Sequence, residues 1–207
     1  ACTFISLHGY ANSVDSLLQR IRVSADDTNK VKLLLSASEK SMADSIPAAI
    51  EYARQAENLS VKLAYNKGLI TAYTALGNCY WRSDAHEHAL GYHHQALKLR
   101  ENLKDSTGMH ASLNRIGQLY GILGNYSKSL EYFFGAIRIA EAMGDKQKIT
   151  VPLHNIGHVY ILMKDYKKAL KFSMDALKLN EETGTPGELA FSYNNIGIAL
   201  THLGEFD

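Results

Sequence analysis

The 207-residue chain has few cysteines, few prolines and almost no net charge. Its two cysteines are too few for a disulfide framework, and its three prolines leave room for long uninterrupted helices. Lys and Arg number 22 against 21 Asp and Glu, and this balance provides no strong field for a phosphate backbone or an anionic membrane. No apolar run reaches the ~18 to 20 residues that a membrane-spanning helix needs. These absences exclude a disulfide-stapled miniprotein, and we expect no nucleic-acid partner and no membrane insertion by this segment.

The remaining composition is that of a folded globular chain, with 46% hydrophobic and 21% charged residues. Residues 1–11 read as the end of an apolar signal region or as an ordinary lead-in that packs on the first helices. The first reading favours an extracytoplasmic over a cytoplasmic location, and the compartment stays open.

One internal repeat runs through most of the chain. Gly77, Gly117, Gly157 and Gly197 recur at a constant period of about 40 residues, and each follows an aliphatic residue. A tyrosine lies three positions after the first three of these glycines. Two columns of small residues follow at the same period, namely Ala89, Ser129, Ala169 and Ala96, Ala136, Ala176.

Each repeat has the pattern of two amphipathic helices. The first carries apolar or small residues at helical spacing, and so does the second: Leu113, Ile116, Gly117, Tyr120 and Tyr126, Leu130, Phe133, Ile137. Gly124-Asn125 between them predicts a helix stop and a tight turn. A glycine inside a helix costs about 1 kcal/mol against alanine. Its recurrence therefore predicts that a neighbouring helix approaches too closely there for a side chain.

The repeat boundaries divide the chain into a lead-in over 1–29 and a repeat domain over 30–207. We expect four hairpins at about 30–69, 70–109, 110–149 and 150–189, and the first helix of a fifth over 190–207. Ala37 takes the glycine position in the first, degenerate repeat. Because the chain stops where a second helix begins, we interpret it as a fragment of a longer protein in which Tyr193, Ile196 and Leu200 are covered.

These features resemble the tetratricopeptide repeat: an aliphatic-Gly-x-x-Tyr first helix, a Gly-x-Tyr turn, then two small residues in the second helix. The usual unit has about 34 residues. The longer unit is similar to repeats of kinesin light chains, of spindle-orientation scaffolds, and of sensor regions that precede bacterial histidine kinases and adenylate or guanylate cyclases. The resemblance implies an all-α, right-handed superhelix (an α-solenoid) whose first helices line a concave groove.

Nothing in the sequence indicates catalysis, a metal site or a cofactor. Four histidines, His86, His88, His93 and His94, lie close in sequence, and His154 and His158 have an i, i+4 spacing that can chelate zinc, but no Cys or carboxylate completes either set. His86 and His93 occupy columns that hold aromatic residues in later repeats, which predicts a packing role. Cys79 has no evident base near it in sequence, and an enzyme is expected only in parts of a longer protein.

The stripe beside the packed face predicts a groove that binds a protein or an extended peptide. In the second repeat the stripe is Thr71, Thr74, Asn78 and Trp81. The residues that we expect to bind the ligand in the four first helices are Asn78, Trp81, Asn114, Gln118, His154, Asn155, His158 and Asn194. Amides suit hydrogen bonds to a peptide backbone, and His154 and His158 are expected to gain charge together near pH ~6. We therefore expect a non-catalytic sensor or scaffold part of a larger bacterial signalling protein. The alternatives are a self-associating module, as in a homodimer, and a sensor of the quorum-peptide type.

Overall fold

The computed structural model describes residues 15–183 and 189–204, and every regular element within them is an α-helix. The fold is therefore all-α, as predicted. The chain divides into two compact units, residues 1–99 and 100–207. Each unit is described by itself.

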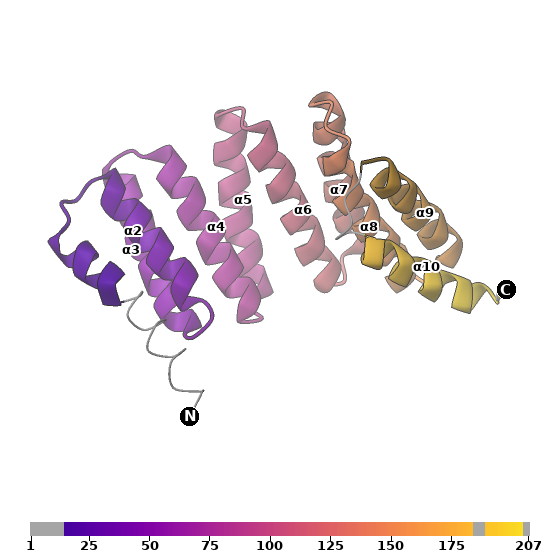
Figure 1. Ribbon diagram of the computed structural model, residues 1–207, viewed down its shortest axis with the longest axis horizontal. Coiled ribbons are helices and arrows are strands. Elements are labelled where there is room, and N and C mark those ends of the chain that lie inside the picture. Colours follow the sequence, from indigo (N-terminus) through magenta and orange to yellow (C-terminus); the bar gives the residue numbers. More distant parts are fainter. Residues whose placement is uncertain (1–14, 184–188, 205–207) are drawn as a thin grey trace. The chain divides into compact units, whose positions relative to one another are not determined.

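The first unit is a row of antiparallel helices. After a helix over residues 15–23 come α2 (Thr28–Ser41), α3 (Ile46–Lys62), α4 (Asn66–Arg82) and α5 (His86–Asn102), whose last residues belong to the second unit. Helix α3 packs against both α2 and α4, and the row can be followed in Figure 1. The apolar core near the start of this unit includes Ile21, Val31, Leu34 and Leu59.

The second unit continues the same pattern. Its helices are α6 (Ser106–Ile122), α7 (Tyr126–Ala142), α8 (Gln147–Leu162), α9 (Tyr166–Thr183) and α10 (Leu189–Leu203), and each packs against the next (Figure 1). Phe133, Ile156 and Val159 form a buried core across α7 and α8. Within the described parts of the chain, no helix is long and apolar enough to cross a membrane.

Left-handed residues end the later helices at regular intervals. Gly124 has φ of +76° directly before Asn125, whose side chain accepts the backbone N–H of Lys128 at the start of α7. The predicted helix stop and turn is thus confirmed. From Ala64 onward, positive φ recurs once per helix wherever the turns are described: Ala64, Asp84, Lys104, Gly124, Gly144, Lys164 and Gly204.

The repeated glycines lie where the second helix of the same hairpin comes closest. A Cβ on Gly77 would lie 2.6 Å from the ring of His93, and one on Gly117 would lie 2.8 Å from the ring of Phe133. On Gly157 it would lie 2.5 Å from the hydroxyl of Ser173. His93, Phe133 and Ser173 recur at the same period as the glycines and are almost fully buried. The predicted close helix contact and the packing role of His93 are therefore confirmed.

The first hairpin departs from the predicted alignment by one position. In the turn after α2 the N–H of Ser45 donates to the carbonyl oxygen four positions back, whereas the N–H of Ala85 after α4 donates to the one five positions back. Ser38 is fully buried, and its hydroxyl donates a 2.7 Å hydrogen bond to the carbonyl oxygen of Ala49. At the matching place in a later hairpin, a Cβ on Gly157 would face the carbonyl of Ala169. Ser38, not Ala37, thus takes the glycine position, because Ser38 and Ala49 are 11 positions apart in the chain whereas Gly157 and Ala169 are 12 apart.

A stacked pair of aromatic rings joins the two helices of each later hairpin. The ring centroids lie 5.6 Å apart in Tyr80–Tyr92, 5.3 Å in Tyr120–Tyr132 and 5.4 Å in Tyr160–Phe172. A third side chain, at the start of the second helix, covers the first tyrosine of each pair: His88 by stacking, and Lys128 and Lys168 by cation–π contact. His88 therefore has a packing role like that of the lysines.

We expect Gly117→Leu to destabilise the protein by about 1 to 3 kcal/mol, because the new side chain would collide with Phe133 in a close-packed contact. Gly197→Leu is the matched control, since nothing among the described residues lies within 4 Å of a Cβ at that position. It should be neutral or slightly stabilising, because leucine favours helix by up to about 1 kcal/mol over glycine. Chemical denaturation of the two variants and the parent measures both effects. Equal losses in the two variants would contradict the proposed role of the close contact.

Candidate binding groove

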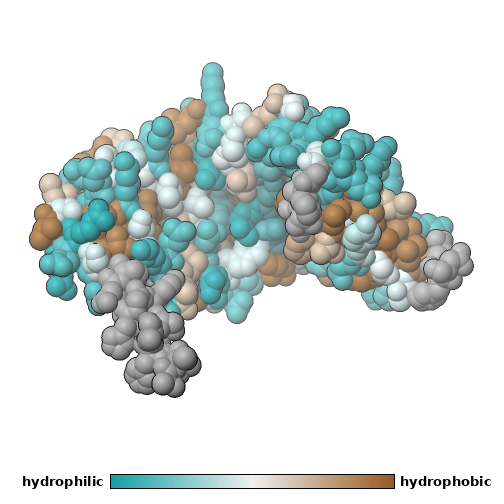
Figure 2. Space-filling model, viewed as in Figure 1, coloured by the Kyte–Doolittle hydropathy of each residue, from teal (hydrophilic) through white to brown (hydrophobic). Residues whose placement is uncertain are grey.

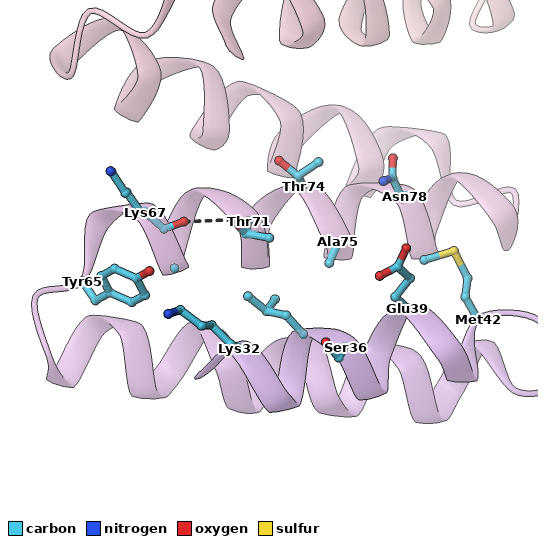
Figure 3. Close-up of a pocket in the computed structure, with 12 residues that line it drawn as sticks. Lys32, Ser36, Glu39, Met42, Tyr65, Lys67, Thr71, Thr74, Ala75 and Asn78 are labelled. Carbon is cyan, nitrogen blue, oxygen red and sulfur yellow. Dashed lines mark hydrogen bonds between the residues drawn. The ribbon is translucent and has the colours of Figure 1, made fainter. Parts of the chain in front are cut away.

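Helices α2 and α4 form an open groove of 650 Å³ in the first unit. They are the first helices of consecutive hairpins and run side by side, as Figure 3 shows. One wall carries residues of α2 and its C-cap, and the other carries residues of α4 and its N-cap: Lys32, Leu35, Ser36, Glu39, Met42 and Tyr65, Lys67, Gly68, Thr71, Thr74, Ala75, Asn78. A volume of this size is typical of sites that hold a small ligand or a short peptide.

The α4 wall presents hydrogen-bond acceptors on a rigid backbone. The hydroxyl of Thr71 donates to the carbonyl of Lys67 at 3.0 Å, and that of Thr74 donates to the carbonyl of Ile70 at 2.9 Å. The hydroxyl oxygen of Thr71 can also accept a hydrogen bond from a further donor. Asn78 is half-buried one turn farther along and offers both an amide donor and an acceptor. The ring of Tyr65 covers Gly68, where a side chain would not fit.

The two ends of the groove differ in charge. Lys32, Lys67 and Tyr65 lie at the end where both helices begin, and Glu39 lies with Asn78 at the opposite end (Figure 3). Apolar Leu35 and Ala75 belong to the same lining. The groove thus combines an apolar and hydroxyl-bearing middle with a cationic end and an anionic end.

Of the two predicted site residues in the first unit, Asn78 lines this groove, together with its predicted stripe neighbours Thr71 and Thr74. Trp81 does not line it; it is half-buried, and its ring meets that of His86 edge to face at 6.2 Å. His86 therefore packs against an aromatic ring, as its column predicts.

The α2 wall was missed by the sequence analysis. The predicted stripe of α4 is Thr71, Thr74, Asn78 and Trp81, and the stripe with the same internal spacing on α2 is Lys32, Leu35, Glu39 and Met42. All four of the latter line the groove. The strict period of the later repeats hid them, because the turn after α2 is shorter by one position and shifts α2 relative to that period.

His154 in the second unit lies in a buried polar cluster. It is 5% exposed, and its ring bonds Asn180 of α9 and Ser192 of α10, each at 3.2 Å. The amide of Asn180 donates to Nε2, so Nδ1 carries the proton and donates to the Ser192 hydroxyl. Asn195 of α10 donates to the His154 backbone carbonyl at 3.1 Å. His154 thereby joins three helices as a neutral ring.

Burial lowers the pKa of His154 to about 4 from its ordinary value of 6.5. The expectation that His154 and His158 gain charge together near pH 6 is therefore wrong. His158 is exposed one turn farther along α8. Burial also lowers the pKa of His110, whose ring is bonded to the backbone carbonyl of Lys148 at 2.8 Å.

The other predicted residues of the second unit differ in how far they are buried. Asn114 is 8% exposed, and its amide donates to the backbone carbonyl of His110 on the preceding turn at 3.2 Å. Gln118 is half-buried and accepts from Arg115, Asn155 is half-buried, and Asn194 is exposed. A ligand contact of these residues stays a prediction, and Asn194 and His158 are the most accessible candidates.

Within the described ranges, no group of three or more His, Cys, Asp or Glu side chains could hold a metal ion. Cys79 is a buried free cysteine, and burial raises the pKa of its thiol. A thiol of raised pKa is a poor nucleophile at neutral pH. Cys2 lies outside the described residues.

A family model of the tetratricopeptide repeat matches residues 69–142 and 108–182. The chain therefore belongs to the tetratricopeptide repeat family. No curated protein matches the sequence.

Solved structures with the same fold are numerous and distant in sequence. A signal transduction ATPase with numerous domains and a tetratricopeptide repeat sensor, from Pyrococcus horikoshii, aligns with a TM-score of 0.84 at 16% identity over 93% of this chain and 30% of that one. Aspartyl phosphate phosphatase F from Bacillus subtilis aligns with a TM-score of 0.82 at 18% identity over 96% of this chain and 51% of that one. A Rap protein in complex with competence and sporulation factor aligns with a TM-score of 0.73 at 18% identity, over 96% and 60%. The chain thus spans about a third to three fifths of these proteins, and the likeness shows the fold.

We expect stability to fall as the pH is lowered from 6.5 to about 4, because the unfolded chain then binds a proton at His154 and the folded protein does not. The contribution of this one residue is full above pH 6.5, and its loss is at most about 3 kcal/mol. Denaturant midpoints across this range measure it.

His154→Gln should make this dependence less steep, with the part due to His110 remaining, and His158→Gln, which changes an exposed histidine on the same helix, is the control with the steepness of the parent. An equally steep dependence in His154→Gln would show that other groups cause the acid sensitivity.

Proposed function

We propose that this chain is a non-catalytic module that binds a protein or peptide segment through the exposed faces of its first helices. The observation that carries the proposal is the groove between α2 and α4, which joins hydroxyl and amide acceptors to apolar side chains in an open channel. Extended peptides need backbone partners and pockets for side chains, and this lining supplies both. The family to which the chain belongs agrees with a scaffold or sensor role.

We further propose that the module is the sensory part of a larger bacterial signalling protein. Support comes from the structural likeness to an ATPase with a tetratricopeptide repeat sensor and to a Rap protein bound to competence and sporulation factor. An output module such as a nucleotide cyclase or a histidine kinase would lie outside these 207 residues. The gene sequence on both sides of this segment tests this proposal, since an open reading frame without such a module contradicts it.

Ala75→Trp should abolish peptide binding, because Ala75 lines the groove and the larger ring would fill it. We would select binders to the 207-residue chain from a random heptapeptide display library and measure them by fluorescence anisotropy. Affinity should fall at least about tenfold in Ala75→Trp, which is a loss of about 1.4 kcal/mol.

Ala142→Trp, at an exposed position at the end of α7, is the matched control and should bind as the parent does. An empty selection, or binders that tolerate Ala75→Trp, would contradict the proposed site. Circular dichroism of both variants checks that the helices are retained.

Self-association is a second candidate function, favoured by the uncovered face of α10. Phe191 and Tyr193 are 64% and 57% exposed, and Tyr193, Gly197 and Ile198 line a shallow hollow of 350 Å³. Figure 2 shows hydrophobic surface over this helix. Among the described residues, no side chain lies against Gly197 as His93, Phe133 and Ser173 lie against the earlier glycines.

If a second copy covers this face, Ile198→Glu should convert a dimer into a monomer, because a charge would be buried in the apolar contact. Sedimentation velocity over a range of protein concentrations measures the change. Ile122→Glu, on an exposed apolar residue at the end of α6, is the control. A parent chain that stays monomeric at all concentrations excludes this candidate.

A further inference from the structure

The charged side chains along the α2–α4 groove have signs that oppose the dipoles of the helices that carry them. Lys67 lies in the first turn of α4 and Lys32 near the start of α2, whereas Glu39 lies in the last turn of α2. A helix start carries partial positive charge and a helix end partial negative charge, so each of these side chains opposes the dipole of its own helix. Such placement costs stability and adds to the electrostatic potential of the groove.

The two lysines and the glutamate act together because α2 and α4 run in the same direction (Figure 3). The start of α4, which has no side-chain cap, and two ammonium groups give one end a positive potential, and Glu39 with the end of α2 gives the other a negative one. Within the described residues, none of the three side chains has an ion-pair partner within 4.0 Å. The acidic residue near Lys32 is Asp27, and its carboxylate is engaged as the N-cap of α2, where it accepts the backbone N–H groups of Asn29 and Lys30.

From this arrangement we propose that the groove selects a dipolar peptide segment, with an acidic side chain at the Lys32/Lys67 end and a basic side chain at the Glu39 end. The inference rests on the proposed peptide-binding function and names its ligand. Lys32 and Glu39 are two helical turns apart, which is about 10 Å along the axis. An extended peptide covers that length in about three residues. The expected motif therefore has its opposite charges about three residues apart, with small or apolar residues between them that meet Leu35 and Ala75.

The experiment uses heptapeptides selected on the parent chain and again on the double variant Lys32→Glu/Lys67→Glu. Parent binders should carry one acidic and one basic residue at the stated spacing. The double variant should bind them at least about tenfold more weakly, and it should instead select peptides that are basic at both ends. The affinity of the parent should also fall with added salt.

Lys40→Glu/Lys98→Glu is the matched control, because it changes the net charge equally at exposed positions that do not line the groove. Peptides that lose binding in Ala75→Trp but bind Lys32→Glu/Lys67→Glu within about twofold of the parent would overturn the dipolar preference and leave the peptide site standing. Peptides insensitive to Ala75→Trp would overturn both. An equal loss in the control variant would show a general charge effect and overturn the assignment to Lys32 and Lys67.

Discussion

Close contact between the two helices of each hairpin is the constraint on which the rest of this structure depends. Packed helices normally keep their axes about 8–10 Å apart, and the distance depends on the side chains at the contact. Gly77, Gly117 and Gly157 remove the side chain from one helix at that contact, and His93, Phe133 and Ser173 fill the space from the other. Because only one partner of each pair can be large, the register of the two helices is defined by this contact. The stacked ring pair then joins the two helices at a second point.

The groove of the first unit is a consequence of the same hairpin geometry. Helix α3 contacts both α2 and α4, and it thereby holds the two first helices parallel at a shared face. Contact between α2 and α4 themselves is less extensive, which leaves room for a channel between their side chains. In the second unit, α8 and α10 are joined instead by His154, Ser192 and Asn195. Two hydrogen bonds thus link this pair of first helices.

Periodicity was enough to predict the helices and the contacts between them, because a close helix contact requires a small residue at the same position of each repeat. A glycine inside a helix has a cost, so its recurrence at Gly117 and Gly157 indicated where a neighbour would lie. The candidate site was predicted less well. Asn114 and His154 share a stripe with Asn78, yet they are buried and Asn78 lines a groove. Whether a polar residue of that stripe is buried or lines a groove depends on the residues opposite it, and those come from other helices.

A strict period also could not predict that one turn differs from the others by one position. The turn after α2 is shorter by one position than the turn after α4, and Lys32 and Glu39 were therefore not aligned with the predicted stripe. Nothing in a mean composition or in a repeat of glycines marks that deletion, since Ala37 and Ser38 are both small. The α2 wall became evident only when the positions of α2 and α3 were known.

The glycine contact also has a consequence for how such a chain can grow. Each glycine and the side chain that fills its space belong to one hairpin, as in the pairs Gly77 and His93, Gly117 and Phe133, and Gly157 and Ser173. A gene duplication that copies a whole hairpin therefore copies both halves of the contact, and no compensating substitution is needed in its neighbours. The residue that fills the space beside the glycine can then be substituted in one copy, as among His, Phe and Ser here, without affecting the other copies. Unequal recombination in units of one whole hairpin is thus the step by which arrays of this kind can lengthen and diversify while each new hairpin stays folded.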